Sequence, residues 1–421
     1  MNENRKIMDE KFQIQVKKEE DGDMNPDEDQ IPKFLVIFLN FILAILSYLI
    51  PKNKKQVVVG SYQFIGNSKH FYLYLVKNKN TECKATWITR SKKIHLKLQE
   101  EGFSVVYLKS LKGFFSILRS QYLLFSHSSR DISYLMWLPG RFNKIQMWHG
   151  IATRGFAKPP TVPKNLPFYE QLIFRLAIHD GKSYHTILTS SEKSKKRDTM
   201  MFQNKNVKII GYPRNDIFFD RSRIYEDFSN KFNLKKYGKV IIFCPTWRIA
   251  PFGKHFSPKV PFSNDFLKEF NEYLRDKNYV LLCKKHKDEI GTRFNFPNLS
   301  NIKHISKEID IQDLLIDVDI MITDYSSVFK DFCLTGRPII FYPFDYEEYI
   351  KDSPIAIDYF NDLPGPFART EQDLLNCLKN LETVTADSKY KEKYRQLVET
   401  NHFYQDGKSS ERLYDYLFKK N

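Results

Sequence analysis

Short β-rich runs alternate with helix-like runs along most of this chain, and this alternation restricts the fold more than any other feature. From Gln56 onward, β-branched and aromatic residues fill the runs "QVVVGSY", "ATWIT", "SVVYL", "YLLFSH", "IQMWHG" and "TILTSS". Between several of them stand helix-like stretches such as "KHFYLYLVKN" and "KKIHLKLQEEG". Strands that alternate with helices in this way predict βα units joined into a parallel sheet.

A second series of the same kind follows a polar segment, "NKFNLKKYGK", which is typical of a linker near Lys235. It contains "VIIFCPTWR", "FLKEFNEYLRD", "YVLLCKKH" and "PIIFYPFD", and the helical patterns "EQDLLNCLKNLE" and "SERLYDYLFKK" close the chain. The sequence therefore predicts an α/β protein with two doubly wound, Rossmann-like domains, residues 56–235 and 236–421. We expect them to face a cleft into which the strand ends point.

The part that precedes these domains has two contrasting segments. Residues 1–30 hold ten acidic and five basic side chains and predict a disordered tail. Residues 31–50 are almost wholly apolar, and the basic "PKNKK" that follows suits a cytoplasmic membrane face. We expect residues 31–55 to form a membrane-associating helix with a basic flank. The sequence leaves open whether this helix spans the membrane, lies on it or is buried against the protein.

Net charge narrows the class of partner, and cysteine content indicates the redox compartment. The chain of 421 residues has a net charge of +16, and the tail contributes −5, so the remainder carries +21. Such an excess suits phosphates, a nucleic acid or a membrane surface, but no helix-turn-helix, RNP or zinc-finger pattern occurs, so nucleic acid is not a predicted partner. The five cysteines are scattered without a CxxC pair, which indicates a reducing compartment.

Reactive side chains recur where the predicted strands end. His149 follows "IQMW", Arg214 follows "VKII" and Arg248 follows "VIIFC". His286 comes after "YVLLC", and Asp324, Ser326 and Ser327 come after "DIMI". Because ligands of doubly wound sheets bind at the carboxyl ends of strands, this shared placement predicts a common site.

Each of these residues also has a purely structural interpretation. His149 beside a Trp is commonly a core histidine, although Gly150 permits close approach of a ligand and Arg154 and Lys158 can hold phosphates. Ser326 or Ser327 can simply cap a helix, or can mark an anion site at its start. Arg214 and Arg248 can pair with carboxylates or bind phosphate. The "DVD" at Asp317–Asp319 is interpreted as structural, so no metal site is predicted.

These motifs together resemble one family. "WHG" with its basic continuation, "GYPRND", "PTWR", "KKHKDE", "TDYSSVFKDF" with "RPIIFYPFDYEEY", and "DGKSSERLYDYL" follow the order seen in the CDP-glycerol glycerophosphotransferases, which include teichoic-acid primases and polymerases. The resemblance covers residues 56–417. It implies a GT-B-type fold at the cytoplasmic face of the bacterial membrane, held peripherally or by a single helix.

The resemblance also implies a reaction and a role for each residue. A phospho-polyol would move from CDP-glycerol or CDP-ribitol to a hydroxyl of an anionic phospho-glycan or lipid-linked acceptor of teichoic-acid or capsule type, with release of CMP. His149 would be the general base and His286 would stabilise charge on the transferred phosphorus. Donor phosphates would be held by Arg214, Arg248, Ser326 and Ser327, and Asp324 would orient their loop or meet hydroxyls of the donor. The acceptor would meet Gly150, Arg154 and Lys158. No cofactor is predicted, and a divalent cation is left open.

The sequence departs from the family pattern at two places, and it also allows two other functions. Lys287 stands where a proline commonly follows the second histidine, and Ile151–Ala152 replace the usual "TP" after "WHG". The second departure falls on the acceptor side, so the identity of the acceptor stays open. The alternatives are a GT-B glycosyltransferase that uses a nucleotide sugar and a non-enzymatic, polyanion-binding membrane protein.

Overall fold

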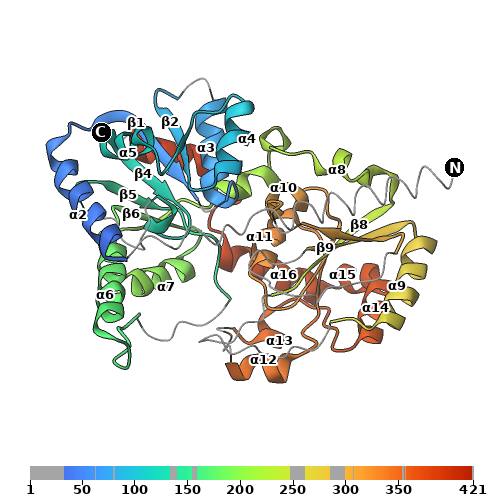
Figure 1. The fold of residues 1–421 in the computed structure, drawn as a ribbon. Coiled ribbons are helices and arrows are strands. Elements are labelled where there is room, and N and C mark those ends of the chain that lie inside the picture. The colour runs from blue at the N-terminus through green and yellow to red at the C-terminus, as the bar shows by residue number, and fades with distance from the viewer. Residues whose placement is uncertain are drawn as a thin grey trace. The chain divides into compact units, whose positions relative to one another are not determined.

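The fold is that of an α/β protein with two parallel sheets, seen in a computed structural model (Figure 1). It describes residues 33–61, 63–78, 81–132, 140–153, 159–246, 261–284, 299–306, 308–352, 355 and 357–419. The acidic tail predicted at residues 1–30 lies outside this range. The α/β class and the parallel sheets predicted from the alternation of runs are confirmed.

The chain forms two compact units. Among the described residues, the N-terminal unit comprises 33–151, 159–223 and 400–419, and the C-terminal unit comprises 152–153 and 224–399. The division therefore falls at Arg223, before the linker predicted near Lys235. Residues from 400 onward return to the N-terminal unit, whereas the sequence placed them in the second domain.

The N-terminal unit is built on a seven-stranded parallel sheet in the order β3-β2-β1-β4-β5-β6-β7. All six predicted strand runs of this half are strands, and a seventh precedes "GYPRND". The strands are β1 (Asn53–Gly60), β2 (Lys84–Thr89), β3 (Val105–Tyr107), β4 (Ser120–Phe125), β5 (Asn143–Gln146), β6 (Thr186–Thr189) and β7 (Val207–Ile209). The order reverses between β1 and β4, as in Rossmann-type sheets.

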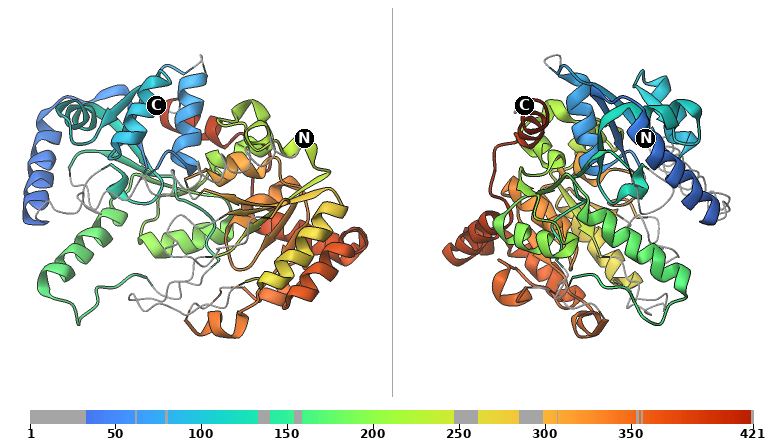
Figure 2. Two further views of the ribbon diagram at one scale, coloured as in Figure 1. Left: turned by 45° about the vertical axis from the view of Figure 1, so that its right-hand side comes forward. Right: turned by 90° about the vertical axis from the view of Figure 1, so that its left-hand side faces the viewer.

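Helices cover both faces of this sheet (Figure 2). They are α2 (Lys33–Leu49), α3 (Gly66–Lys77), α4 (Lys92–Glu100), α5 (Leu111–Arg119), α6 (Phe168–Lys182), α7 (Glu192–Phe202) and α17 (Ser409–Phe418), with 3₁₀ turns η2 (Ser129–Asp131), η3 (Pro213–Phe218) and η4 (Arg221–Arg223). Because side chains alternate along a strand, Val57 and Val59 enter the core under α3 and α17, while Val58 enters the core under α5. A strand buried on both faces requires this continuous apolar run.

The return of α17 to the N-terminal unit has a clear physical cause. Leu413, Tyr414 and Leu417 are buried in the same cluster as Val57 and Val59, and the hydroxyl of Tyr122 donates to the carbonyl of Leu417 at 2.9 Å. The apolar face of "SERLYDYLF" therefore completes the first sheet.

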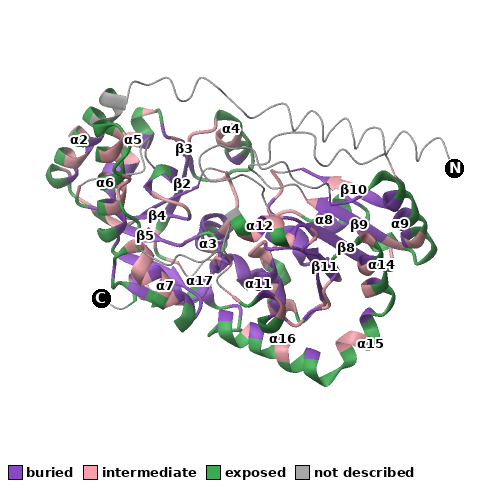
Figure 3. Cartoon of the chain, turned by 90° about the horizontal axis from the view of Figure 1, so that it is seen from below, coloured by how far each residue is buried: buried purple, intermediate pink, exposed green. Residues whose placement is uncertain are grey.

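The C-terminal unit contains a five-stranded parallel sheet in the order β10-β9-β8-β11-β12. Its strands are β8 (Lys239–Cys244), β9 (Tyr279–Lys284), β10 (Ile302–Ile305), β11 (Ile320–Thr323) and β12 (Ile339–Phe341). They appear as a buried layer, and the exposed residues lie on the surrounding helices (Figure 3). The order again reverses at one place, between β8 and β11.

Amphipathic helices flank this second sheet. In α9, Phe266, Phe270 and Leu274 repeat at helical spacing and pack against Ile241 and Phe243. The helices are α8 (Phe228–Lys231), α9 (Asn264–Asp276), α10 (Ile311–Leu315), α11 (Val328–Phe332), α12 (Tyr346–Asp352), α13 (Tyr359–Asp362), α14 (Glu371–Lys379), α15 (Leu381–Ala386) and α16 (Ser388–Asn401), with 3₁₀ turns η5 (Leu234–Lys236) and η7 (Cys333–Thr335). No disulfide joins the five cysteines.

Helix α2 packs on the N-terminal unit through a face that is partly polar. Its buried residues include the polar Asn40 and Ser47 as well as Leu43, and the Ser47 hydroxyl accepts the backbone N–H of Arg141 at 2.8 Å. Large apolar side chains such as Phe41, 60% exposed, point away from the unit. Within the described part of the chain, no helix combines the length and the apolar character needed to cross a membrane.

Candidate functional site

The "WHG" segment leaves strand β5 in a strained conformation. Trp148 has a φ of +60° and Gly150 a φ of +152°, both in the region that favours glycine. The indole of Trp148 is buried, whereas His149 is exposed. His149 is therefore not a core histidine. A strained backbone that presents one polar side chain to solvent is commonly found at functional sites.

Two buried side chains hold this segment in place. The Asn67 amide, at the start of α3, donates to the carbonyls of Met147 and Trp148 at 2.9 and 2.8 Å. Its oxygen accepts the backbone N–H of Arg214 at 3.1 Å. The guanidinium of Arg214 in turn donates to the carbonyl of His149 at 2.6 Å. Thus α3 and the "GYPRND" turn both fix the backbone of the WHG segment.

A second histidine lies against His149 that the sequence analysis did not select. The rings of His127 and His149 are stacked with centroids 5.1 Å apart and an interplanar angle of 12°. His127 follows β4, which lies at the point where the strand order reverses. The signal was present in "YLLFSH", where a histidine comes two residues after the strand, and the strand-end rule used for the other residues applies to it equally.

Asp216 has a structural task in the same turn. It accepts the backbone N–H groups of Ser409 and Ser410, each at 2.8 Å, and the Ser410 hydroxyl at 2.6 Å. It also lies 3.1 Å from a guanidinium nitrogen of Arg223. Burial nevertheless raises its pKa, because desolvation disfavours the charged carboxylate. Asp216 thus holds the first turn of α17 and links the "GYPRND" turn to the "DGKSS" segment.

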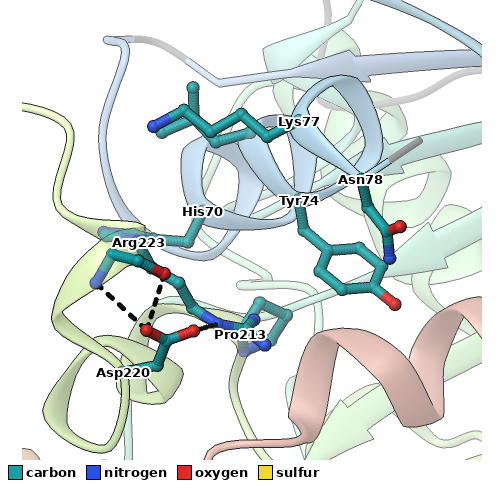
Figure 4. A pocket seen from close by; sticks show the side chains of 9 residues that line it. His70, Tyr74, Lys77, Asn78, Pro213, Asp220 and Arg223 are labelled. Atoms are coloured by element: carbon teal, nitrogen blue, oxygen red, sulfur yellow. Dashed lines mark hydrogen bonds and ion pairs between the residues drawn. The ribbon is translucent and has the colours of Figure 1, made fainter. Parts of the chain in front are cut away.

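A pocket of about 230 Å³ opens beside this turn, on α3 and the two 3₁₀ turns (Figure 4). Within it Arg223 and Asp220 form an ion pair at 3.2 Å. None of the residues predicted for the site lines this pocket. Its lining consists of His70, Leu73, Tyr74, Lys77, Asn78, Pro213, Asp220, Ser222 and Arg223.

In the C-terminal unit, Asp324 ties together the two strand ends where the order reverses. One of its carboxylate oxygens accepts the backbone N–H and the hydroxyl of Thr246, at 2.7 and 2.6 Å, and the N–H of Tyr325 at 2.6 Å. The side chain is fully buried. Asp324 therefore orients the loops after β8 and β11, which is one of the two roles that the sequence suggested for it. Thr246 was not singled out there, because its role depends on pairing across the sheet.

Ser326 and Ser327 follow Asp324 and are half-buried. Ser327 occupies the N-cap position of α11, which begins at Val328, but its side chain makes no capping hydrogen bond. The capping interpretation is therefore wrong for Ser327. Both hydroxyls lie on the loop that Asp324 orients.

Lys284 ends β9 and is a half-buried cation of this unit. Its ammonium donates to the carbonyl of Ser306 at 2.9 Å. Desolvation lowers its pKa to about 8, although Cys244, Asp310 and Glu308 act in the opposite direction. A lysine with a pKa near neutrality at a strand end is typical of functional regions.

Four predicted site residues lie outside the described residues: Arg154, Lys158, Arg248 and His286. Of the remaining six, His149, Gly150 and Arg214 come together in the N-terminal unit, and Asp324, Ser326 and Ser327 come together in the C-terminal unit. Among the described residues, no group of three or more His, Cys, Asp or Glu could hold a metal ion. In the "DVD" segment, Asp319 accepts the backbone N–H of Val240 at 2.7 Å, as a structural residue does.

Two doubly wound parallel sheets with polar residues at their strand ends define a Rossmann-type α/β protein, a class that binds its ligands at those ends. The comparison with known proteins is more specific. The chain belongs to the CDP-Glycerol:Poly(glycerophosphate) glycerophosphotransferase family, whose model matches residues 42–419.

Its relatives are proteins of teichoic-acid synthesis. The ribitol-phosphate polymerase TarL of Staphylococcus aureus is 30% identical over 65% of this chain and 47% of its own length. The teichoic acid glycerol-phosphate transferase of the same organism is 26% identical over 87% of this chain and 94% of its own. This chain spans about half the length of several of the curated polymerases that it matches. A solved structure of the wall teichoic acid polymerase TagF shares the fold, with a TM-score of 0.72 and 22% identity over 92% of this chain and 95% of that one.

Proposed function

We propose that this protein transfers a phospho-polyol from a CDP-alcohol to a hydroxyl of a teichoic-acid or capsule-type acceptor and releases CMP. Its family supports this reaction, and so do the names of relatives that polymerise or transfer ribitol phosphate and glycerol phosphate. One TagF structure was obtained after a soak with CDPG. CDP-glycerol and CDP-ribitol are the two donors to be considered.

The observation that carries the proposal is the exposed His149, presented by a backbone that Asn67 and Arg214 hold rigidly. A neutral imidazole can accept the proton of the acceptor hydroxyl as its oxygen attacks the phosphorus that bears the polyol. A new P–O bond to the acceptor forms, the P–O bond to CMP breaks, and CMP leaves with the electron pair. Gly150, Arg154 and Lys158 are proposed to meet the anionic acceptor next to this histidine.

The donor is assigned to the C-terminal unit. The hydroxyls of Ser326 and Ser327 lie on a loop that Asp324 orients where the strand order reverses, the usual place for a nucleotide in a Rossmann-type sheet. Arg248 and His286, which follow β8 and β9 in the sequence, are proposed to hold the diphosphate and to stabilise charge in the transition state. Arg214 is proposed to contribute positive charge for phosphate while it fixes the loop of His149. The fold would then be of GT-B type.

The exposed apolar side chains of α2 support contact with the membrane. Phe38, Phe41 and Tyr48 are 58%, 60% and 65% exposed, and the basic flank "PKNKK" comes directly after the helix. Helix α6, at the same side of the N-terminal unit in Figures 1 and 3, exposes Phe168 and Tyr169. Apolar side chains with adjacent lysines suit a bilayer that contains anionic lipids. We place the protein at the cytoplasmic face of the bacterial membrane.

A direct assay tests this function. The full chain is incubated separately with CDP-glycerol and CDP-ribitol, candidate phospho-glycan acceptors are added, and CMP and product length are measured. The expected result is CMP release that depends on the acceptor. A thermal-shift assay with a panel of nucleotides distinguishes this function from that of a glycosyltransferase. Stabilisation by UDP- or GDP-sugars in place of CDP-alcohols would favour the glycosyltransferase.

A further inference from the structure

The loops that carry His127 and His149 follow two neighbouring strands that end at the same level of the sheet. Strands β4 and β5 pair in parallel, with Phe125 opposite Gln146. His127 comes two residues after the end of β4 and His149 three residues after the end of β5, so both side chains leave the same edge of the sheet. The register explains why two imidazoles distant in sequence form a stack.

A single buried amide connects the two loops. The Gln146 nitrogen donates to the carbonyl of His127 at 2.9 Å, and its oxygen accepts the N–H of Trp148 at 3.0 Å. Gln146 is fully buried. The backbones on either side of the stack are therefore held at a fixed separation, so the contact between the rings does not depend on the rings alone.

His127 is itself held by its own loop and by the residue that follows β1. The carboxylate of Asp131, 4% exposed, accepts the N–H groups of Ser126 and His127 at 3.0 and 2.9 Å. The same oxygen lies 3.4 Å from Nδ1 of His127, and the Ser61 hydroxyl lies 3.5 Å from that nitrogen. Asp131 is thus the charged group that faces this ring from its own loop, and Ser61 faces it from the end of β1.

We propose that His127 is a positioning residue, which holds the His149 imidazole in the orientation required for proton transfer. An exposed side chain at a loop ordinarily samples several rotamers, and a flat ring stacked on its face removes that freedom. The indole of Trp148, with its centroid 4.2 Å from that of His149, limits the ring further. This inference rests on the proposed function, in which His149 is the base.

Two substitutions distinguish the effect of the flat ring of His127 from the effect of its nitrogen atoms. His127→Ala removes the stack, whereas His127→Phe keeps a flat ring and lacks the N–H. We expect His127→Ala to lower kcat by about 10–100-fold, the effect of a misplaced catalytic group, with the donor KM changed by less than about threefold. His127→Phe should recover most of this loss. His185→Ala, at an exposed position directly before β6, is the matched control and should retain wild-type kcat.

A spectroscopic measurement reports on the stack without any turnover. With histidine labelled at Cε1, the His149 proton signal is assigned by its loss in His149→Ala. It should move downfield in His127→Ala, because the shielding by the stacked ring is lost, and stay shielded in His127→Phe. The inference is overturned if this signal does not move in His127→Ala, if His127→Ala keeps wild-type kcat, or if His127→Phe is as slow as His127→Ala. If the wild-type chain itself releases no CMP, the proposed function fails, and the signal still decides whether the rings stack.

Discussion

Arg214 donates a hydrogen bond of 2.6 Å to the main-chain carbonyl of His149. Arg214 is 9% exposed, and its backbone N–H donates to the side-chain oxygen of Asn67. One arginine therefore links the "GYPRND" turn to the segment that presents the candidate base. The sequence pointed to Arg214 as a phosphate contact, but the geometry gives it a second task, which is to fix where His149 stands.

Replacing Arg214 tests which of these two tasks matters more. Arg214→Lys keeps the charge but loses the planar fork, so we expect kcat to fall by about 10-fold or more and the free energy of unfolding to fall by about 1–3 kcal/mol. Steady-state kinetics and urea denaturation measure both. Arg221→Lys, at an exposed position in η4, is the control. A rise in the donor KM with kcat unchanged would instead assign Arg214 to phosphate binding.

His149→Ala is expected to abolish CMP release, a loss of about 10²–10⁴-fold, because a general base contributes that much. Since the side chain is exposed and its own loop is held through backbone carbonyls, the melting temperature should stay near that of the wild type. Stabilisation by CDP-glycerol in a thermal-shift assay should also persist. Turnover close to wild type in this variant would remove His149 from the mechanism.

Thr246 provides a test of the donor side. Thr246→Val removes the hydroxyl that donates to Asp324 at 2.6 Å, and we expect a loss of about 1–2 kcal/mol in the free energy of unfolding together with weaker binding of CDP-glycerol. Thr246→Ser keeps the hydroxyl and is the matched control. Urea denaturation and titration calorimetry give the two values. Equal donor affinity in both variants would argue that this loop does not meet the nucleotide.

Lys284 makes a pH-dependent contribution to stability. Burial lowers its pKa from 10.5 to about 8, so between these values the unfolded chain binds a proton that the folded chain does not. Stability from this residue therefore rises with pH across that window, and below about pH 8 its burial is a cost. Lys284→Met should remove this rise. The free energies of unfolding of both proteins at pH 7 and pH 9.5 test it, with the exposed Lys268→Met as control, and an identical pH dependence in wild type and Lys284→Met would contradict it.

The membrane proposal makes a prediction about α2. Replacing Phe38 and Phe41 by Ser removes two exposed apolar side chains, and because each fully inserted side chain contributes about 1.5–3 kcal/mol, binding should weaken at least 10-fold. Cosedimentation with vesicles that contain phosphatidylglycerol measures this. The matched control replaces the exposed Leu96 and Leu111, on α4 and α5, by Ser. Unchanged vesicle binding in the α2 variant would exclude this helix as the contact.

Much of the fold could be predicted because strands and helices leave local periodicities. Runs such as "QVVVG" and "VIIFC" contain enough consecutive apolar residues to identify strands buried on both faces. The boundary between the units could not be predicted in this way. The apolar face of α17 shows that this helix packs on a sheet, but nothing local distinguishes the first sheet from the second.

The residues of the candidate site were likewise predictable only where a local pattern marks them. The rule that reactive residues follow strands found His149 and Asp324, and it would have found His127 had it been applied to "YLLFSH". Asn67 and Gln146 could not be recognised, because an amide in a helix or a strand carries no sign of which carbonyl it will meet. Their roles arise only when α3, β4 and β5 are placed together.

The position of α17 has a consequence for how the protein is made. A ribosome releases β1 and β4 before the second sheet, yet the cluster that contains Val57 and Tyr122 is completed only when residues 409–418 have emerged, because α3 covers just part of it. Until then, the part of this cluster that α17 covers stays accessible to solvent and to other nascent chains, while all strands of the second sheet are already available to fold. The N-terminal unit is therefore completed after the strands of the C-terminal unit have been made, and its incomplete core is where a chaperone has most apolar surface to bind.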